Sequence, residues 1–237
     1  MQVIILAGGL GTRLAEETDS IPKPMVRIGP DPIIRHIMNH FAQFDHTEFI
    51  VAAGYKVEVI EEYFAGAHLP SDWRVSVIDT GLETATGGRL LRLKDLLAER
   101  FLLTYGDGLS DVNLSSLVEY HLAAGKTGTV TAVRPPARFG TLEITNGIVT
   151  KFSEKDPQDV GWINGGFFVL EKRFVDYIQN DQTVLEQEPL RRLSSEGLLS
   201  GYEHRHWWHP MDTLRDKREL EEIWKTGNPP WIVKRHG

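Results

Sequence analysis

The stretch VIILAGGLGTRL, residues 3–14, places five apolar residues directly before a loop with three glycines and an arginine. The apolar run predicts a strand buried on both faces, which is typical of a parallel sheet. Gly8, Gly9 and Gly11 let backbone N–H groups approach an anion closely, and Thr12 and Arg13 add a hydroxyl and a bidentate donor. Neither G-x-G-x-x-G nor G-x-x-x-x-G-K-[ST] is present. The loop therefore predicts another kind of phosphate site, and a plain strand–helix turn is the alternative.

Strands and helices alternate through the first half of the chain. Apolar runs predict strands at residues 3–7, 48–53, 75–79 and 101–105, and helical spacing predicts helices at 32–44, 57–64, 90–97 and 114–123. Asn113 is positioned to cap the last of these helices. This order predicts an α/β fold with a Rossmann-like, doubly wound, mostly parallel sheet.

The second half is richer in strands. Residues 141–145 and 148–152 flank Asn146-Gly147, a type I′ hairpin signal. Further strands are expected at 129–133, 163–170 and near 200–206, two helical stretches precede the last of these, and a helix at 214–226 ends before GNPPW. No linker or repeat is visible. We therefore expect a single domain over 1–237, with a strand-rich portion at about 134–170 and a C-terminal helix at about 213–226.

Composition excludes several classes of protein. The net charge of −7 argues against general nucleic-acid binding, and the absence of cysteine excludes disulfides and thiolate metal sites. No charged leader or apolar stretch of about 18 residues is present. We expect a cytoplasmic protein with neither a membrane nor a nucleic acid as partner.

Charged residues cluster at the predicted carboxyl ends of strands, where open parallel sheets bind ligands. Asp107, in YGDG after the strand at 101–105, is a natural Mg²⁺ ligand beside phosphates, and Asp212 in HPMDT is a possible second one. Lys23 lies between two prolines in IPKPM and could point its charge at phosphate. Each residue has an ordinary interpretation: Asp107 as a turn aspartate, Asp212 as a helix N-cap, and Lys23 as a surface lysine.

The second half adds polar residues suited to a sugar and its phosphate. Glu154 and Lys155 occur in SEKD at a strand end, and Asn164 and Gly165 occur in INGGFFVL. A carboxylate, an ammonium and a carboxamide together suit hydroxyl groups and an anomeric phosphate. Each residue alone reads as an ordinary loop residue.

The histidines do not match known metal motifs. In HRHWWH, residues 204–209, we find no neighbouring carboxylate at the spacing of a catalytic zinc site. His36 and His40 lack the glutamate of H-E-x-x-H, so we expect them to be solvated or to serve in packing. No G-x-S-x-G elbow is present either, which leaves covalent acyl chemistry without support.

With these motifs in order, the chain resembles the sugar-1-phosphate nucleotidyltransferases. The resemblance covers essentially the whole chain, and its later motifs look most like the glucose-1-phosphate cytidylyltransferase branch. The matching segments are LAGGLGTRLAEETDSIPKPM, TGGRL, YGDG, FGTLEI, FSEK, INGGFFVL, EQEPL and PMDTLRDKRELEEIW.

The resemblance implies a Mg²⁺-dependent reaction of CTP with α-D-glucose 1-phosphate that gives CDP-glucose and pyrophosphate, used for surface polysaccharides. Phosphate and nucleotide contacts would come from Leu6, Gly8, Gly9, Gly11, Thr12, Arg13 and Lys23, and the turn Gly87, Gly88, Arg89 would approach the base and triphosphate. Asp107 and Asp212 would bind the metal. The sugar-phosphate site would comprise Gly140, Glu154, Lys155, Asn164 and Gly165, and Arg13, Lys23, Asp107 and Lys155 would carry the catalysis.

Two features depart from that family pattern. The sequence lacks a long segment before VIDTG, residues 77–81, that takes part in subunit contacts in relatives, and EKDPQ replaces the common EKP. A homo-oligomer is possible. Other nucleoside triphosphates or sugar 1-phosphates are the first alternative function, and a non-catalytic nucleotide-binding module is the second. An NAD-dependent oxidoreductase is excluded because the dinucleotide fingerprint is absent.

Overall fold

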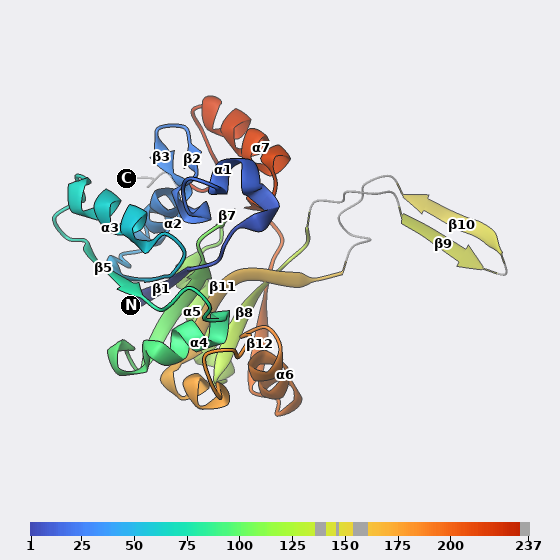
Figure 1. The fold of residues 1–237 in the computed structure, drawn as a ribbon. Coiled ribbons are helices and arrows are strands. Elements are labelled where there is room, and N and C mark those ends of the chain that lie inside the picture. The colour runs from blue at the N-terminus through green and yellow to red at the C-terminus, as the bar shows by residue number, and fades with distance from the viewer. Residues whose placement is uncertain (136–140, 146, 154–160, 233–237) are drawn as a thin grey trace.

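A mixed seven-stranded sheet forms the centre of the computed structural model, which describes residues 1–135, 141–145, 147–153 and 161–232 (Figure 1). Its strand order is β12-β8-β11-β6-β1-β4-β5, and β11 runs antiparallel to both of its neighbours while the other neighbouring pairs are parallel. The strands are β1 (Gln2–Ala7), β4 (Glu48–Ala53), β5 (Arg74–Asp79), β6 (Arg100–Tyr105), β8 (Gly128–Val133), β11 (Ile163–Glu171) and β12 (Leu199–His204). The predicted mostly parallel sheet is confirmed.

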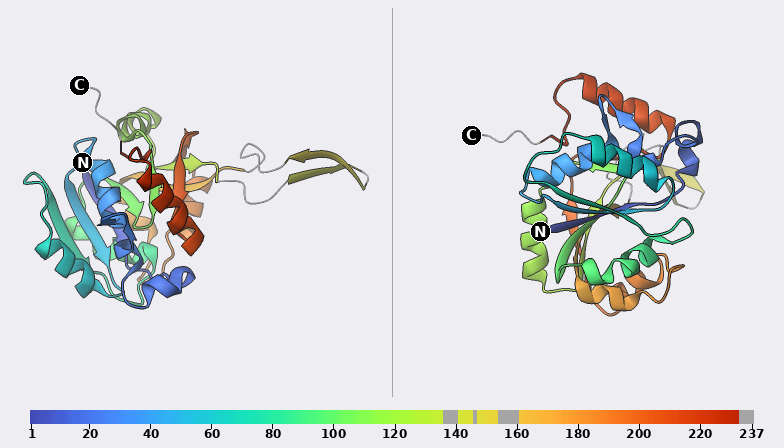
Figure 2. Two further views of the ribbon diagram at one scale, coloured as in Figure 1. Left: turned by 90° about the horizontal axis from the view of Figure 1, so that it is seen from above. Right: turned by 60° about the vertical axis from the view of Figure 1, so that its left-hand side comes forward.

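Helices cover both faces of this sheet, as the two views of Figure 2 show. The helices are α1 (Ala15–Thr18), α2 (Ile33–Ala42), α3 (Val57–Gly66), α4 (Thr86–Arg92), α5 (Leu114–Ala124), α6 (Glu188–Ser195) and α7 (Leu214–Lys225). Alternate residues of β1 face opposite sides: Val3 and Ile5 join a buried cluster with α2, and Ile4 joins a second cluster with Leu90 of α4. Burial on both sides explains the uninterrupted apolar run of β1.

The predicted hairpin forms in the second half of the chain. β9 (Thr141–Thr145) and β10 (Ile148–Ser153) pair antiparallel, and Gly147 at their turn has a φ of 80°. Asn146 lies outside the described residues. The described residues also form two smaller antiparallel ladders. β2 (Arg27–Ile28) pairs with β3 (Asp31–Pro32), and β7 (Gly108–Ser110) pairs with β13 (Trp208–Pro210). Among the described residues, no helix has the length and apolar character needed to cross a bilayer.

The expected helix at 90–97 is wrong in its bounds. α4 begins four residues earlier, at Thr86, ends at Arg92, and is followed by a 3-10 turn at Lys94–Leu96. Glycines at 87 and 88 sit in its first turn because a Cβ there would lie 2.6 Å from the carbonyl oxygen of Thr183 and 2.1 Å from that of Asp181. The two glycines therefore belong to the helix, where they allow two backbones to pack closely. Apolar periodicity does not report such packing, so the predicted start is too late.

One of the two helical stretches expected before residue 200 is also different. Lys172–Tyr177 forms a 3-10 helix, and α6 is the regular helix of the pair. The other expected elements differ from the observed ones by a few residues at their ends. α2 begins at Ile33 because Pro32, which has an extended backbone, is its N-cap residue.

Candidate active site

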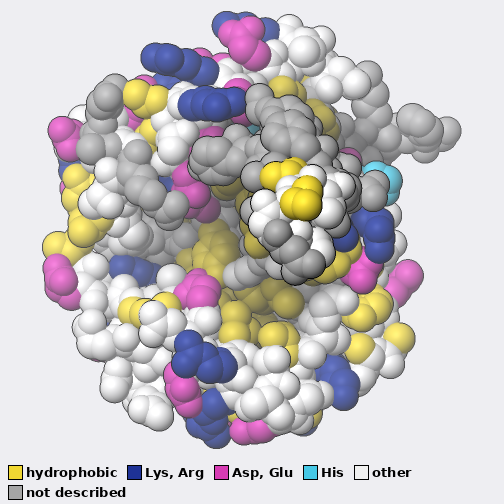
Figure 3. Space-filling model, turned by 90° about the vertical axis from the view of Figure 1, so that its right-hand side faces the viewer, with side chains coloured by type: hydrophobic (Ala, Val, Ile, Leu, Met, Phe, Trp, Pro, Cys, Tyr) yellow, Lys and Arg dark blue, Asp and Glu magenta, His cyan; other side chains and the backbone are white. Residues whose placement is uncertain are grey.

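A cleft of about 480 Å³ opens at the carboxyl ends of β1 and β6, where the strand order reverses direction. This is the place where doubly wound sheets bind ligands. Figure 3 shows the face onto which these strand ends open, and it is hollowed beside the hairpin. The cleft is lined by Leu6, Ala7, Gly8, Gly9, Gly11, Thr12, Lys23, Pro24, Thr84, Ala85, Thr86, Arg89, Tyr105, Gly106, Asp107 and Val184.

The glycine loop forms one wall of this cleft. Gly11 has a φ of 65°, a left-handed conformation that favours glycine, and a Cβ on Gly9 would meet no atom within 4 Å. Within the part of the chain that the structure describes, no hydrogen bond uses the N–H groups of Gly9 and Gly11. Open space beside free N–H groups is what an anion such as a triphosphate requires.

Arg89 supports this loop from beneath. Its guanidinium donates to the carbonyl oxygens of Gly8 (2.9 Å) and Ala53 (2.9 Å) and to Thr80 Oγ1 (2.7 Å), and the residue is 4% exposed. Burial lowers the pKa of Arg89, but an arginine remains protonated at any physiological pH. A Cβ at Gly8 would lie 2.1 Å from the Arg89 guanidinium, so glycine at this position also makes room for the arginine.

The expectation that residues 87–89 form a turn is wrong, because they are the first turn of α4. Gly87 and Gly88 are absent from the residues that line the cleft, and their N–H groups donate to the carbonyl of Thr183 at 3.0 and 3.2 Å. Their contact with a nucleotide stays a prediction. In this structure the pair serves to pack α4 against the segment that carries residue 183.

Lys23 brings together the two aspartates that the sequence proposes as metal ligands. Its ammonium lies 2.7 Å from Asp107 Oδ2 and 2.8 Å from Asp212 Oδ1. Burial disfavours the charged lysine, but the two ion pairs outweigh this and raise the pKa of Lys23 above its ordinary value. Lys23 is therefore positively charged at neutral pH.

The ladder between β7 and β13 explains why two residues so far apart in sequence meet. Asp107 directly precedes β7, and Asp212 follows β13 by two positions. Their antiparallel pairing, extended by the bond from the Met211 N–H to the Asp107 carbonyl (2.8 Å), places the two carboxylates side by side. The alternative of Asp212 as a helix N-cap is wrong, because Thr213 is the N-cap of α7 and forms a capping box with Asp216.

The pair of carboxylates fits a Mg²⁺ ion. Both contact one cation, the Lys23 ammonium, so their oxygens converge on the same point. One or two carboxylates, completed by phosphate oxygens and water, is the usual protein contribution to Mg²⁺. Asp107 and Asp212 would hold the ion, and Lys23 would then turn its charge towards the phosphates beside it.

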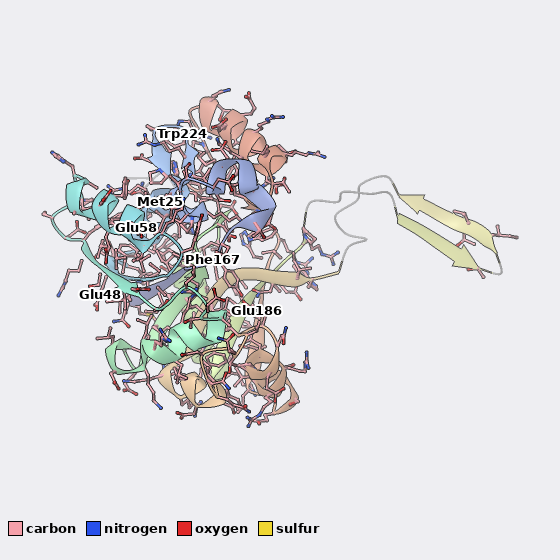
Figure 4. The ribbon with its side chains drawn as sticks, viewed as in Figure 1. Met25, Glu48, Glu58, Phe167, Glu186 and Trp224 are labelled. Atoms are coloured by element: carbon pink, nitrogen blue, oxygen red, sulfur yellow. The ribbon has the colours of Figure 1, made fainter. Side chains whose placement is uncertain are left out.

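A hydrogen-bonded group that sequence reasoning missed includes Tyr105 and Thr86, two residues that line the cleft. Glu186, labelled in Figure 4, accepts from Tyr105 Oη at 2.5 Å and from Thr86 Oγ1 at 2.7 Å. Asn164 Nδ2 donates to the same Tyr105 oxygen at 3.2 Å. Burial first, and then Glu186, raise the pKa of Tyr105, so its hydroxyl keeps its proton. In the sequence, Glu186 is marked only by the motif EQEPL, and no function is predicted for it.

The predicted sugar-phosphate residues are only partly within the described structure. Asn164 lies beside Tyr105 at the cleft, and Gly165 packs so closely that a Cβ would be 2.6 Å from Val133 Cγ1. Gly140, Glu154 and Lys155 lie outside the described residues, as does the side chain of Arg13. Their roles stay predictions.

The buried histidines are packing residues rather than solvated ones. His36 Nε2 donates to the carbonyl of Ile28 (2.8 Å) and His40 Nε2 to that of Val112 (3.0 Å). HRHWWH has no carboxylate at the sequence spacing of a catalytic zinc site, but in the structure carboxylates lie beside two of its histidines. His204 lies 2.9 Å from Asp111, and His209 lies 3.0 Å from Glu219, because the fold brings distant segments together.

Comparison with known proteins identifies the family of this chain. A family model described as nucleotidyl transferase matches residues 2–202. The chain belongs to the nucleotidyl transferase family. The glucose-1-phosphate cytidylyltransferase of Salmonella typhimurium is 47% identical to it, over 98% of this chain and 98% of that protein. The mannose-1-phosphate guanyltransferase beta-A of Xenopus laevis is 29% identical, over 98% of this chain and 68% of its own length.

Solved structures share the fold of this nucleotidyl transferase. The crystal structure of HddC from Yersinia pseudotuberculosis complexed with GMP-PN has a TM-score of 0.75 and 24% sequence identity, and the match covers 94% of this chain and 99% of that one. At this level of identity the similarity describes the fold alone. It agrees with the mixed, mostly parallel sheet of this chain.

Proposed function

We propose that this protein transfers a cytidylyl group from CTP to α-D-glucose 1-phosphate, giving CDP-glucose and pyrophosphate. The observation that carries the proposal is its 47% identity, over 98% of both chains, to the Salmonella typhimurium glucose-1-phosphate cytidylyltransferase. The cleft supports it, because a glycine loop faces a lysine and two convergent aspartates there.

The chemistry needs no covalent intermediate on the protein. A phosphate oxygen of glucose 1-phosphate attacks the α-phosphorus of CTP, the new P–O bond forms, and the bond to the β-phosphate breaks as pyrophosphate leaves. The attacking phosphate is already an anion at neutral pH, so no strong general base is required. The main obstacle is the approach of one anion to another.

The chain's own groups address that obstacle. The free N–H groups of Gly9 and Gly11 bind the triphosphate, and Lys23, whose Cβ lies beside Gly11, offsets its negative charge. Asp107 and Asp212 would hold Mg²⁺, which when bound would neutralise phosphate charge and help to align the reacting groups. Arg13 and Lys155 add positive charge in this proposal, on the strength of the motifs in which they occur.

The hydrogen-bonded group of Glu186, Tyr105 and Asn164 orients the sugar in this proposal. Glu186 holds the Tyr105 hydroxyl, which in turn accepts from Asn164, so the carboxamide of Asn164 is fixed at the edge of the cleft. A fixed carboxamide can accept from and donate to sugar hydroxyls, and alignment of the two substrates supplies much of the rate. Glu154, Lys155 and Gly140 complete this side in the proposal.

The test is pyrophosphate release with Mg²⁺ and glucose 1-phosphate, with CTP, UTP, dTTP, GTP and ATP offered separately. We expect release with CTP at a kcat/KM at least tenfold above that with any other nucleotide. Faster release with another nucleotide would keep the reaction class and overturn the base preference. No release with any nucleotide, across a panel of sugar 1-phosphates, would favour the non-catalytic binding module.

A further inference from the structure

A second cluster of metal-ligating side chains lies where β13 meets α7. One atom each from His209, Asp216 and Glu219 lies within 4.8 Å of the other two. His209 and Asp216 are buried, at 8% and 5% exposure, and Glu219 is half-buried. His209 Nε2 and Glu219 Oε2 are 3.0 Å apart. One imidazole and two carboxylates form a donor set that suits zinc and its neighbours in the first transition row.

Each of these three side chains also has a hydrogen-bond partner outside the cluster. His209 Nδ1 donates to the Pro210 carbonyl at 2.8 Å and Nε2 donates to Glu219 Oε2 at 3.0 Å, so an ion would replace the Nε2 proton and use that lone pair. Glu219 Oε1 accepts from Arg215 Nε at 2.7 Å, and Asp216 Oδ2 accepts from the Thr213 N–H at 2.8 Å. Metal sites are built in this way, with outer partners that fix each ligand's orientation.

The spacing of His209 and Glu219 is close to what a bound ion needs, and the Asp216 carboxylate, within 4.8 Å of both, would close on the ion. Two ligands about 2.1 Å from zinc lie about 3.4 Å apart in a tetrahedron, so the 3.0 Å between His209 and Glu219 must open by only a few tenths of an ångström. A groove of about 430 Å³, lined in part by these two residues, gives an ion a path from solvent. The charged residues of the groove lining are two glutamates (Glu219, Glu222) and two arginines (Arg215, Arg218), and the buried Asp216 adds a carboxylate to the cluster itself.

We propose that His209, Asp216 and Glu219 form a binding site for a divalent transition ion of the zinc class, separate from the Asp107–Asp212 pair. The ion ties β13 to α7 across the loop that carries Asp212. Asp216 Oδ2 also accepts from the Asp212 N–H at 3.0 Å, so the site holds the backbone of a carboxylate that is predicted to bind Mg²⁺. An imidazole ligand disfavours Mg²⁺, which requires oxygen ligands, so the two sites select different ions.

The test is binding of Zn²⁺ by the full chain in excess Mg²⁺, by calorimetry, together with the visible absorption of bound Co²⁺. We expect one saturable Zn²⁺ site, a Co²⁺ spectrum that Zn²⁺ abolishes, and a rise in Tm on binding. His209→Gln and Glu219→Gln should each raise the Kd at least tenfold. His206→Gln, a change to an exposed histidine of the same segment, should leave the Kd unchanged.

Three results would overturn the proposal. One is a wild-type protein that binds no Zn²⁺ under these conditions, and another is a His209→Gln protein that binds as tightly as wild type. The third is loss of binding in Asp107→Asn with binding retained in His209→Gln, which would place the ion in the cleft. Far-ultraviolet circular dichroism establishes that each variant is folded, and Glu219→Gln, at a half-buried position, serves if His209→Gln is not.

Discussion

Lys23 lies between Asp107 and Asp212, the two carboxylates proposed to hold Mg²⁺, so the lysine and the ion would compete for them. Lys23→Met removes the competitor and leaves two like charges facing one another. We therefore expect affinity for Mn²⁺, used as a probe for Mg²⁺ in the absence of nucleotide, to rise about tenfold, which is about 1.4 kcal/mol. Electron paramagnetic resonance of free Mn²⁺ measures this.

The same variant should lose activity, because the positive charge that offsets the triphosphate is gone. We expect kcat to fall by about 10²–10³. Lys94→Met, at an exposed lysine, is the control and should change neither quantity. Unchanged Mn²⁺ affinity in Lys23→Met would contradict competition between the lysine and the ion.

Asp107 should act mainly on the chemical step. Asp107→Asn keeps the size of the side chain but removes one of two negative ligands, so we expect turnover to fall by about 10²–10³ while the KM for glucose 1-phosphate changes little. Steady-state kinetics at saturating Mg²⁺ measures both, with exposed Asp95→Asn as the control. Near-normal turnover would mean that Asp107 is not a metal ligand.

At the scale of the elements, α4 is set by contact between two backbones. Gly88→Ala would place a Cβ 2.1 Å from the carbonyl oxygen of Asp181, and a backbone oxygen cannot move aside as a flexible side chain can. We expect the free energy of unfolding to fall by about 1–3 kcal/mol. Denaturant unfolding monitored by tryptophan fluorescence measures this.

Gly66→Ala is the matched control, because Gly66 also lies in a helix and a Cβ there would meet no atom within 4 Å. It should be neutral or stabilising by up to about 1 kcal/mol, as expected when alanine replaces a helical glycine without a clash. Equal destabilisation by both substitutions would show that the contact with Asp181 is not the reason that position 88 requires glycine.

The same elements show what sequence can and cannot report. The apolar run of β1, the Asn113 cap of α5 and the hairpin turn at Gly147 are local signals, and the structure confirms all three. Long-range neighbours are invisible in sequence. The Glu186–Tyr105 hydrogen bond forms only because the fold brings these two segments together, and the same holds for the carboxylates beside His209. Gly88 is predicted in a loop because its packing against Asp181 is not visible in sequence.

At the scale of the whole molecule, buried neutral histidines couple stability to pH. His40 packs beneath the sheet at 2% exposure, and burial lowers its pKa from about 6.5 to about 4. Between these values the unfolded chain binds a proton that the folded chain excludes, so stability rises with pH across this window. The contribution is fully present above pH 6.5 and is lost as pH falls towards 4.

We expect this loss to be roughly 3 kcal/mol for His40, from a difference of about 2.5 pKa units at about 1.4 kcal/mol each. His40→Gln keeps a donor for the Val112 carbonyl but cannot titrate, so its unfolding free energy should fall less steeply between pH 6.5 and pH 4 than that of the wild type. Exposed His68→Gln should retain the wild-type slope. Denaturant titrations at half-unit pH intervals measure the slopes, and parallel curves for wild type and His40→Gln would assign the acid sensitivity of the fold to other groups.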